Sequence, residues 1–515
     1  MKFILPTSLL KGIVVLLLIA GGTAHAQNSQ FNGKMSRAQL EDYLDRTMVL
    51  SFDSLDKGMP AYNDLVNFAA RCNARCLANT FTVGYGSELP INFGFFNKVQ
   101  TAVTDIQNAY AKKGLVAPMV GAAIWESVTK NVDSIWMNDE VANTFHVAKR
   151  RFIYDSIKYM NDPAKDRATP DISRPETQMY FYYLATEFIK SGIEVLHMGI
   201  IEYEDKNDTN HLCTWDLLCK IRDYGATKNR GIVLINADTW GVRLKKTDTL
   251  LYDYVMIPTR VSGYYTGHDS TWSSMWNYRE SPYGGPGRLS VTDCSPFGKI
   301  GGGYVNLGWY ADSIPYQVVL DNTLTNNCNC LVYATCYTVY GFDEISWFTL
   351  QSEDYRNEWL CYANSETKRL DKNCHFVMPG RKIYSRRWSY YSAMNGYGFN
   401  QEDAIINTWN GTQKDCNPND KPNLREIWGS GKNLAVMVYP NPVTDAANIV
   451  YTAPPGNEVT LKIIDVLGKT VAYYETGKNH GSFLWDTHSI PTGNYFCTAS
   501  AEKGDVASFR ITVLR

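Results

Sequence analysis

The sequence lacks a strong charge of either sign: 50 lysines and arginines oppose 52 aspartates and glutamates over 515 residues, a formal net charge of -2. Nucleic-acid-binding domains usually carry a basic face, so this balance argues against a nucleic-acid partner. No apolar run after residue 26 reaches the roughly 18 residues that a membrane-spanning helix needs. We therefore expect no transmembrane span in the mature chain.

Motifs of several common enzyme classes are also missing. No G-x-S-x-G elbow is present, which argues against an α/β-hydrolase esterase. The glycines at 301–303 lack the lysine and the following helix of a phosphate-binding loop. His211, Cys213 and Cys219 lie close in sequence but without paired C-x-x-C spacing. We expect no metal site and no cofactor.

Residues 1–26 have the features of a secretory signal peptide. Lys2 and Lys11 flank an apolar core, and Ala24-His25-Ala26 is an A-x-A cleavage site. Export makes disulfides possible for the twelve cysteines. Sequence does not fix the pairing, and the expected local pairs are Cys213–Cys219 and Cys361–Cys374.

The main part of the chain alternates apolar strands with helical patterns. The clearest unit spans residues 169–205, with a Ser173/Glu176 capping box, an amphipathic helix, Gly192 as its stop and an apolar strand that ends at Glu202. The eight expected strands are Arg75–Val83, Met119–Glu126, Ile193–Glu202, Gly231–Ala237, Tyr252–Thr259, Tyr316–Asp321, Glu344–Phe348 and Phe376–Met378. Eight strands alternating with helices predict an α/β fold, a closed (β/α)8 TIM-like barrel. A doubly wound sheet is the alternative, but its glycine-rich turn after the first strand is missing.

Two long insertions interrupt this pattern, from about Ser127 to Pro170 and from about Arg260 to Pro315. Both follow strands, so we expect both on the carboxyl face of the barrel. The second is rich in aromatic residues, including Trp272 and Trp276. Such a loop either packs its own rings or forms a wall of a sugar-binding cleft.

The composition changes near the C-terminus. A polar segment rich in proline and glycine is followed by short alternating runs that predict a small all-β, Ig-like sandwich. The expected parts are a signal peptide at 1–26, a leader at 27–46, the barrel at 47–412, a linker at 413–432 and the sandwich at 433–515.

The sandwich closely resembles the type A C-terminal sorting domain of the type IX secretion system. The matching residues are Val438-Tyr439-Pro440-Asn441-Pro442, Ile464-Asp465-Val466-Leu467-Gly468-Lys469 and Ile490-Pro491-Thr492-Gly493-Asn494-Tyr495. The resemblance implies recognition by the type IX machinery, export across the outer membrane and a secreted or cell-surface location. It does not bear on what the exported barrel does.

The barrel resembles a group of secreted, glycoside-hydrolase-like TIM-barrel proteins. The stretches that carry this resemblance are PDISRPETQMYFYYLATEFI, LHMGIIE, PYQVVLDN and YGFDEISWFTLQSEDYRNEWLCYA. The resemblance implies a barrel and a carbohydrate ligand, but no settled catalytic residues. These must be argued from position.

Glycosidases need two carboxyl groups across a cleft, and on a barrel both stand at carboxyl ends of strands. This filter keeps four acids: Glu126, Glu202, Asp238 and Asp321. Each could equally cap the following helix. We expect Glu202 to be the acid/base, because its apolar strand would raise its pKa, with Asp321 opposite and Glu126 in reserve.

Two further residues could bind substrate. Asn322 adds a second polar group beside Asp321, and Arg260 follows a strand as a cation for the substrate or as one half of an ordinary salt bridge. The sequence thus predicts a secreted glycoside hydrolase that acts on polysaccharide or glycan through two carboxylates. The alternative is a non-catalytic glycan-binding or structural protein on a barrel scaffold at the cell surface.

Overall fold

The computed structural model describes residues 31–514 with internal gaps. The gaps are 54–55, 85–90, 92–93, 161, 164, 260–263, 266–277, 280–288, 290–295, 321–352, 385–386, 391–400, 414–415, 417–433, 440–442, 444–445, 454–456, 478–479 and 502–505.

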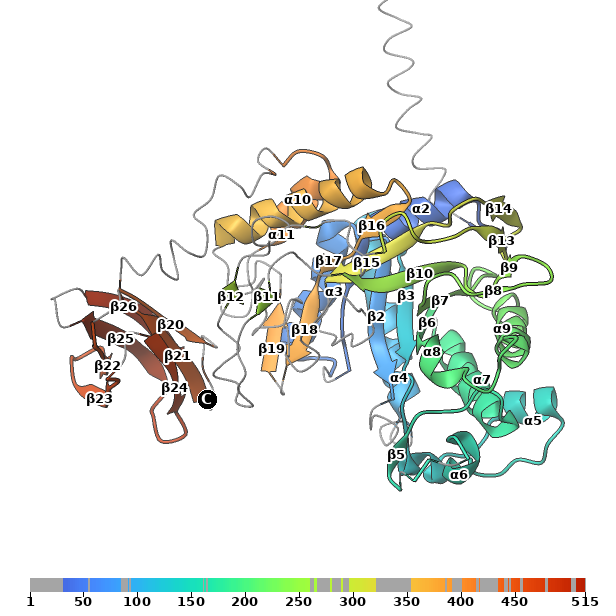
Figure 1. Ribbon diagram of the computed structural model, residues 1–515, viewed down its shortest axis with the longest axis horizontal. Coiled ribbons are helices and arrows are strands. Elements are labelled where there is room, and N and C mark those ends of the chain that lie inside the picture. Colours follow the sequence, from blue (N-terminus) through green and yellow to red (C-terminus); the bar gives the residue numbers. More distant parts are fainter. Residues whose placement is uncertain are drawn as a thin grey trace, which may run out of the picture.

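A closed parallel barrel forms the larger part of the protein (Figure 1). Its strands, in chain order, are β1 (Thr47–Val49), β2 (Cys76–Val83), β3 (Met119–Ile124), β6 (Val195–Ile200), β7 (Leu234–Asp238), β10 (Tyr254–Thr259), β15 (Tyr316–Leu320) and a last run divided into β16 (Cys374–Phe376) and β17 (Met378–Pro379). The last run closes the sheet, because β16 pairs with β15 while β17 pairs with β1. Counting β16 and β17 as one strand gives eight, so the predicted (β/α)8 architecture is confirmed.

The strand assignment differs from the prediction at one place. The first barrel strand, β1, has three residues and was not predicted, because so short a run carries no recognisable alternation. The expected strand Glu344–Phe348 lies outside the described residues, but β15 pairs directly with β16 and leaves no place for a strand between them. The strand that leads to Glu202 is therefore the fourth of the barrel, and the strand that leads to Asp321 is the seventh.

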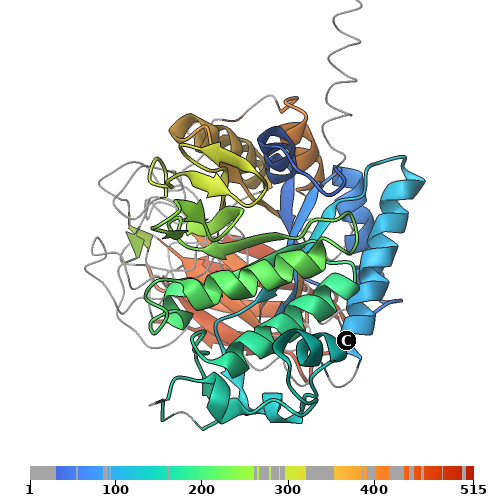
Figure 2. The same ribbon diagram turned by 90° about the vertical axis from the view of Figure 1, so that its right-hand side faces the viewer.

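Helices surround the barrel, and Figure 2 shows α7 and α9, in green, lying side by side. The longer ones are α3 (Pro60–Cys72), α4 (Phe95–Lys112), α7 (Pro175–Lys190), α9 (Leu212–Gly225), α10 (Glu353–Leu370) and α11 (Glu402–Trp409). Helix α2 (Arg37–Asp45) begins with a capping box between Ser36 and Gln39. Its apolar face, with Phe31 and Met35, packs on the first residues of the barrel strands and closes their amino end.

The first insertion lies between β3 and α7 and contains short elements, of which α5, α6 and β5 are labelled at the lower right of Figure 1. They are β4 (Val128–Thr129), η2 (Lys130–Ser134), α5 (Asp139–Phe145), α6 (Tyr154–Ile157) and β5 (Arg167–Ala168). The predicted Ser173/Glu176 capping box that follows it is wrong. The Ser173 hydroxyl donates to Asp171, and Glu176 forms an ion pair with Arg150 instead.

Part of the second insertion lies at an unexpected end of the barrel. A four-stranded sheet replaces a helix between β7 and β15, made of β8 (Arg243–Leu244), β9 (Thr249–Leu250), β13 (Gly303–Val305) and β14 (Trp309–Ala311). The Trp309 indole N–H donates to the carbonyl of Met35, at the closed amino end. For this segment the expected position on the carboxyl face is wrong, because the chain must return to the amino end before β15 begins. The other described strands of the barrel region form two hairpins, β11 (Tyr264–Tyr265) with β12 (Tyr278–Arg279) and β18 (Arg381–Tyr384) with β19 (Arg387–Tyr390).

The predicted cysteine pairs are corrected by the structure. Cys361 on α10 is bonded to Cys416, beyond α11, and not to Cys374, which is a buried free thiol in β16. Cys213 and Cys219 are also free. Both lie on α9 six positions apart, and this spacing places two side chains on different faces of a helix.

The C-terminal domain is an all-β sandwich, as predicted. One antiparallel sheet contains β20 (Ala435–Tyr439), β21 (Ala446–Thr452) and β24 (His480–Asp486). The other contains β22 (Val459–Asp465), β23 (Thr470–Glu475), β25 (Gly493–Ala501) and β26 (Val506–Val513). Their inner faces form a core that shares no residue with the barrel core, and Cys497 is part of it.

Candidate active site at the carboxyl end of the barrel

Three of the four predicted acids lie at the ends of neighbouring barrel strands. Glu126 follows β3, Glu202 lies in the single-turn helix α8 (Ile201–Glu204) directly after β6, and Asp238 ends β7. In the sheet order, β6 lies between β3 and β7. The carboxyl ends of these three parallel strands therefore carry one group of acids. Asp321, Asn322, Arg260, Trp272 and Trp276 lie outside the described residues.

Hydrogen bonds join this group across the strands. The Ile200 N–H donates to Glu126 Oε2 at 3.3 Å, and Ile200 is the β-sheet partner of Asp238. The Thr239 hydroxyl donates to Glu202 Oε1 at 3.2 Å. Glu202 is thus bonded to the residue that directly follows Asp238.

A glycine in β6 makes room for the Glu126 carboxyl. Gly199 has a φ of +68°, and the pairing of β6 with β7 shifts register between His197 and Ile200. A Cβ atom at position 199 would overlap the Glu126 carboxyl. The bulge and the glycine together let a buried acid lie against the end of the strand.

Glu202 is the acid with the clearest access to solvent. Its side chain is exposed, whereas Glu126 is buried. Partial withdrawal from water raises the pKa of Glu202 above its ordinary value, opposed by hydrogen bonds from its own backbone and from Thr239. A raised pKa in an accessible carboxyl is the property that a proton donor needs near neutral pH.

A second buried acid, Glu204, belongs to the same group and was not predicted. It is only 1% exposed, and neither of its carboxyl oxygens has a hydrogen-bond partner among the described residues. Burial raises its pKa well above the ordinary value, and the nearby Glu126 and Asp205 raise it further. The clue to Glu204 in the sequence is its position two residues after Glu202. In a helical turn, this spacing places the two acidic side chains on different sides.

Polar side chains also line the interior of the barrel below this group. His197 Nδ1 lies 2.7 Å from Asn236 Oδ1, and the Asn236 amide donates to the Tyr254 hydroxyl at 2.9 Å. An amide oxygen only accepts hydrogen bonds, so His197 Nδ1 carries a proton. Trp125 packs edge-on against the imidazole with ring centroids 5.2 Å apart. His197 is therefore a buried histidine with a hydrogen-bonded ring.

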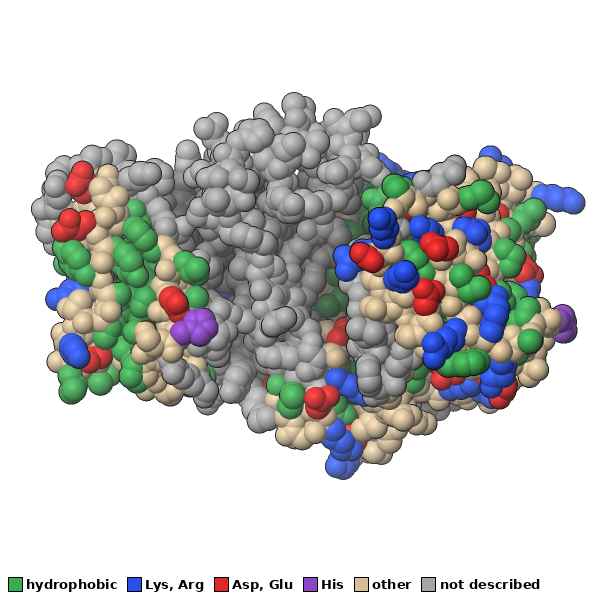
Figure 3. Space-filling view, turned by 90° about the horizontal axis from the view of Figure 1, so that it is seen from below, with side chains coloured by type: hydrophobic (Ala, Val, Ile, Leu, Met, Phe, Trp, Pro, Cys, Tyr) green, Lys and Arg blue, Asp and Glu red, His purple; other side chains and the backbone are tan. Residues whose placement is uncertain are grey.

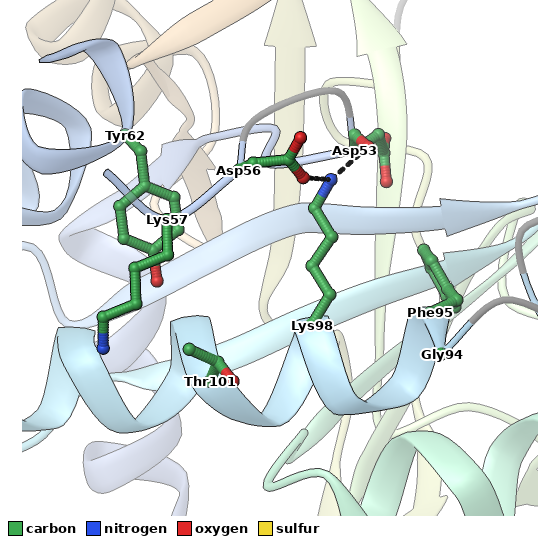
Figure 4. Close-up of a pocket in the computed structure, with 8 residues that line it drawn as sticks. All are labelled: Asp53, Asp56, Lys57, Tyr62, Gly94, Phe95, Lys98 and Thr101. Carbon is green, nitrogen blue, oxygen red and sulfur yellow. Dashed lines mark hydrogen bonds and ion pairs between the residues drawn. The ribbon is translucent and has the colours of Figure 1, made fainter. Parts of the chain in front are cut away.

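A cavity of about 420 Å³ lies elsewhere, between the segment after β1 and the first turns of α4 (Figure 4). Lys98 extends into it and binds Asp56 Oδ1 at 3.1 Å and the Asp53 carbonyl at 3.0 Å. Its other lysine, Lys57, binds Asp105 at 2.9 Å. The lysines of the cavity thus already have anionic partners, and the cavity does not include the group of acids at the strand ends.

Two features are absent from the described part of the chain. No three His, Cys, Asp or Glu side chains there are grouped so that they could hold a metal ion. None of the helices there combines the length and the apolar character needed to cross a membrane.

The C-terminal sandwich matches a known family. Residues 437–513 fit the family model of the secretion system C-terminal sorting domain, so the predicted sorting domain is confirmed. The chain is a secreted α/β-barrel protein whose sorting domain directs it to type IX secretion, to the cell surface or the extracellular space. Comparison with curated proteins gives no match.

Solved structures show weak likeness. The Thermotoga petrophila endo-beta-1,4-mannanase is 9% identical, covering 91% of this chain and 98% of that chain, with a TM-score of 0.32. The Bacillus halodurans endo-beta-1,4-glucanase B is 12% identical, covering 92% and 79%, with a TM-score of 0.31. PorZ of Porphyromonas gingivalis, a surface component of the type IX secretion system, is 22% identical over 16% of this chain, with a TM-score of 0.14. The match to PorZ spans only 11% of that protein. With TM-scores below 0.5, these likenesses assign no activity.

Proposed function

We propose that the protein is a secreted glycoside hydrolase that acts on polysaccharide or glycan with two carboxyl groups. The observation that carries the proposal is the position of Glu202, an exposed carboxyl with a raised pKa, directly after a strand at the carboxyl end of a closed barrel. Asp238 ends the neighbouring strand. This is the end at which barrel enzymes build their active sites. The sorting domain supports a substrate that lies outside the cell.

In this proposal Glu202 donates the proton to the glycosidic oxygen. Its exposure and its raised pKa support that role. The second carboxyl acts as nucleophile or general base, and we assign it to Asp321 with Asp238 as the competing residue. Asn322, Arg260, Trp272 and Trp276 are the proposed substrate-binding residues.

The position of Glu126 favours a structural role over the predicted role as reserve catalytic acid. It is buried, and its carboxylate already accepts the backbone N–H of Ile200. We propose that it fixes the end of β6, and hence the start of α8, rather than contacting the sugar. This makes Glu126 a positioning residue for Glu202.

The test is release of reducing sugar by the purified protein across a panel of β-mannan, β-glucan, xylan and host-type glycans. We expect Glu202→Gln to lower turnover by about 10²–10⁴-fold, the usual contribution of a general acid. Asp321→Asn and Asp238→Asn distinguish the second carboxyl, because only one of them should cause a comparable loss. Wild-type turnover in Glu202→Gln would refute the assignment, and no turnover of any glycan by the wild type would argue against the class.

A non-catalytic glycan-binding protein is the second candidate. One observation favours it: Glu126 is used in a backbone hydrogen bond, so one of the four predicted acids already has a structural role. Calorimetric titration of the same glycans would decide. Binding without turnover, unchanged in Glu202→Gln and Asp321→Asn, would support the binding protein.

A further inference from the structure

The turn between β22 and β23 of the sorting domain places two large apolar side chains in solvent. Val466 is 66% exposed and Leu467 is 90% exposed, the highest value of any large hydrophobic residue in the described part of the chain. We call these two residues the 466–467 tip. Figure 3 shows that hydrophobic side chains are also frequent elsewhere on the surface of this domain, at the left.

Hydrogen bonds hold this turn in one conformation. Asp465 Oδ1 accepts from the backbone N–H of Leu467 and of Lys469, each at 2.9 Å. The Asp465 N–H donates to the Lys469 carbonyl at 2.9 Å, and Gly468 supplies a φ of +83°. An aspartate that accepts from the following backbone, with glycine at the left-handed position, is a stable turn.

The turn does not itself require apolar residues at its tip. Asp465 and Gly468 supply the acceptor and the positive φ, whereas the side chains at 466 and 467 extend into solvent. Serine or asparagine would fit this conformation equally well and would be better solvated. Two apolar side chains on a preformed turn therefore point to a contact with another molecule, since a rigid contact loses little conformational entropy on binding.

We propose that the 466–467 tip docks into an apolar pocket on a protein of the type IX secretion machinery. The partner follows from the position of the turn within residues 437–513, which match the sorting domain that this machinery reads. A lipid surface fits less well. The turn Asp465–Lys469 has no aromatic residue and a single cation, whereas peripheral anchors combine aromatic and several basic side chains.

Two other exposed apolar residues of the same domain provide matched controls. Leu484 in β24 is 67% exposed and Val506 at the start of β26 is 65% exposed. Both lie in strands rather than in a turn fixed by a side chain. They test whether exposed apolar surface in general, or the 466–467 tip in particular, matters for export.

The experiment follows the full-length chain in a bacterium that has a type IX secretion system. The fraction outside the outer membrane is measured by immunoblot and protease accessibility. We expect Val466→Ser/Leu467→Ser to lower this fraction about tenfold or more, with the remainder held in the periplasm, and Leu484→Ser/Val506→Ser to be exported like the wild type. The Tm of each purified protein should be unchanged, because these side chains do not pack in the core.

A second pair of variants tests the fixed conformation. Asp465→Ala removes the acceptor of both N–H groups and should reduce export, whereas Asp465→Asn keeps an acceptor oxygen and should restore most of it. Normal export of the tip variant, or equal loss in the control variant, would overturn the proposal. It would also be overturned if the wild type, but not the tip variant, bound vesicles of phosphatidylethanolamine and phosphatidylglycerol, which would indicate a lipid partner.

Discussion

Glu204 shows how a single buried side chain couples the site to pH. Its pKa is raised by burial and by the neighbouring Glu126 and Asp205, so the folded protein holds a proton that the unfolded chain gives up above its ordinary pKa of about 4.3. The free energy of unfolding therefore falls as the pH rises from that value toward the folded-state pKa. Tyr252, buried with its hydroxyl unpartnered among the described residues, lies near the same group. Burial raises its pKa, and the negative charges of Glu204 and Asp205 raise it further.

The first prediction concerns Glu204→Gln. A neutral amide removes this titration, so we expect the variant to be more stable than the wild type at pH 7–8. The gain should be about 1.4 kcal/mol for each pH unit above about 4.3, up to the folded-state pKa of Glu204. The advantage should shrink to near zero at about pH 4, where the wild-type carboxyl is protonated in both states. Thermal unfolding across this pH range measures it, with exposed Asp223→Asn on α9 as the control. An advantage independent of pH would contradict the assigned protonation.

Gly199 gives the second prediction. Gly199→Ala introduces a Cβ atom against the Glu126 carboxyl at a positive φ, so we expect destabilisation by about 2–4 kcal/mol. Gly114 has nearly the same φ, +67°, with no atom within 4 Å of its Cβ position. Gly114→Ala therefore measures the backbone effect alone. In urea unfolding, Gly199→Ala should lower the free energy of unfolding less when Glu126→Ala is also present. If the effects of the two substitutions simply add, the overlap with the Glu126 carboxyl is not the cause.

At the scale of elements, the apolar strands carried the strongest information in the sequence. The run that ends at Glu202 was recognised because burial on both faces leaves a continuous apolar pattern. The strand Thr47–Val49 has no such length, and it is defined only by its pairing with β2 and β17. Ser173 and Glu176 have capping-box spacing, but Ser173 donates to Asp171, two residues before it, and Glu176 pairs with Arg150 from the first insertion.

The candidate site, like the strands, could be predicted in part from the sequence. Positions at strand ends are local, so Glu126, Glu202 and Asp238 could be named from the sequence. Their connections depend on which strands are neighbours and on the bulge at Gly199, which the sequence does not specify. Glu204 and Trp125 were not predicted. The burial of Glu204 and the contact of the Trp125 ring with His197 arise only when the barrel is packed.

The disulfide provides the third prediction, at the element scale. Cys361 and Cys416 are 55 residues apart and join α10 to the segment beyond α11. Closing a loop of this length reduces the entropy of the unfolded chain, a stabilisation of about 4 kcal/mol in the chain-entropy account. We expect Cys361→Ser to lower the Tm by several degrees in the absence of reductant, whereas Cys213→Ser, at a free thiol, should not. A similar Tm for Cys361→Ser and the wild type would contradict this stabilising role.

At the scale of the whole molecule, function divides between two bodies with separate cores. The barrel carries the acids at its strand ends, and the sandwich carries the sorting signal, with no shared core residue. A chain that ends at residue 432 keeps both cysteines of the disulfide and the complete barrel core. We therefore expect it to fold, to keep the glycan turnover of the full chain and to remain in the periplasm.

Calorimetry and fractionation check this fourth prediction together. The full chain should unfold in two transitions, and the truncated chain should retain the one that belongs to the barrel, at an unchanged Tm. Loss of that transition would show that the barrel needs the sandwich to fold, and the two bodies would then not be independent. Export of the truncated chain would instead show that a signal outside residues 437–513 directs secretion, because the segment that matches the sorting domain would be absent.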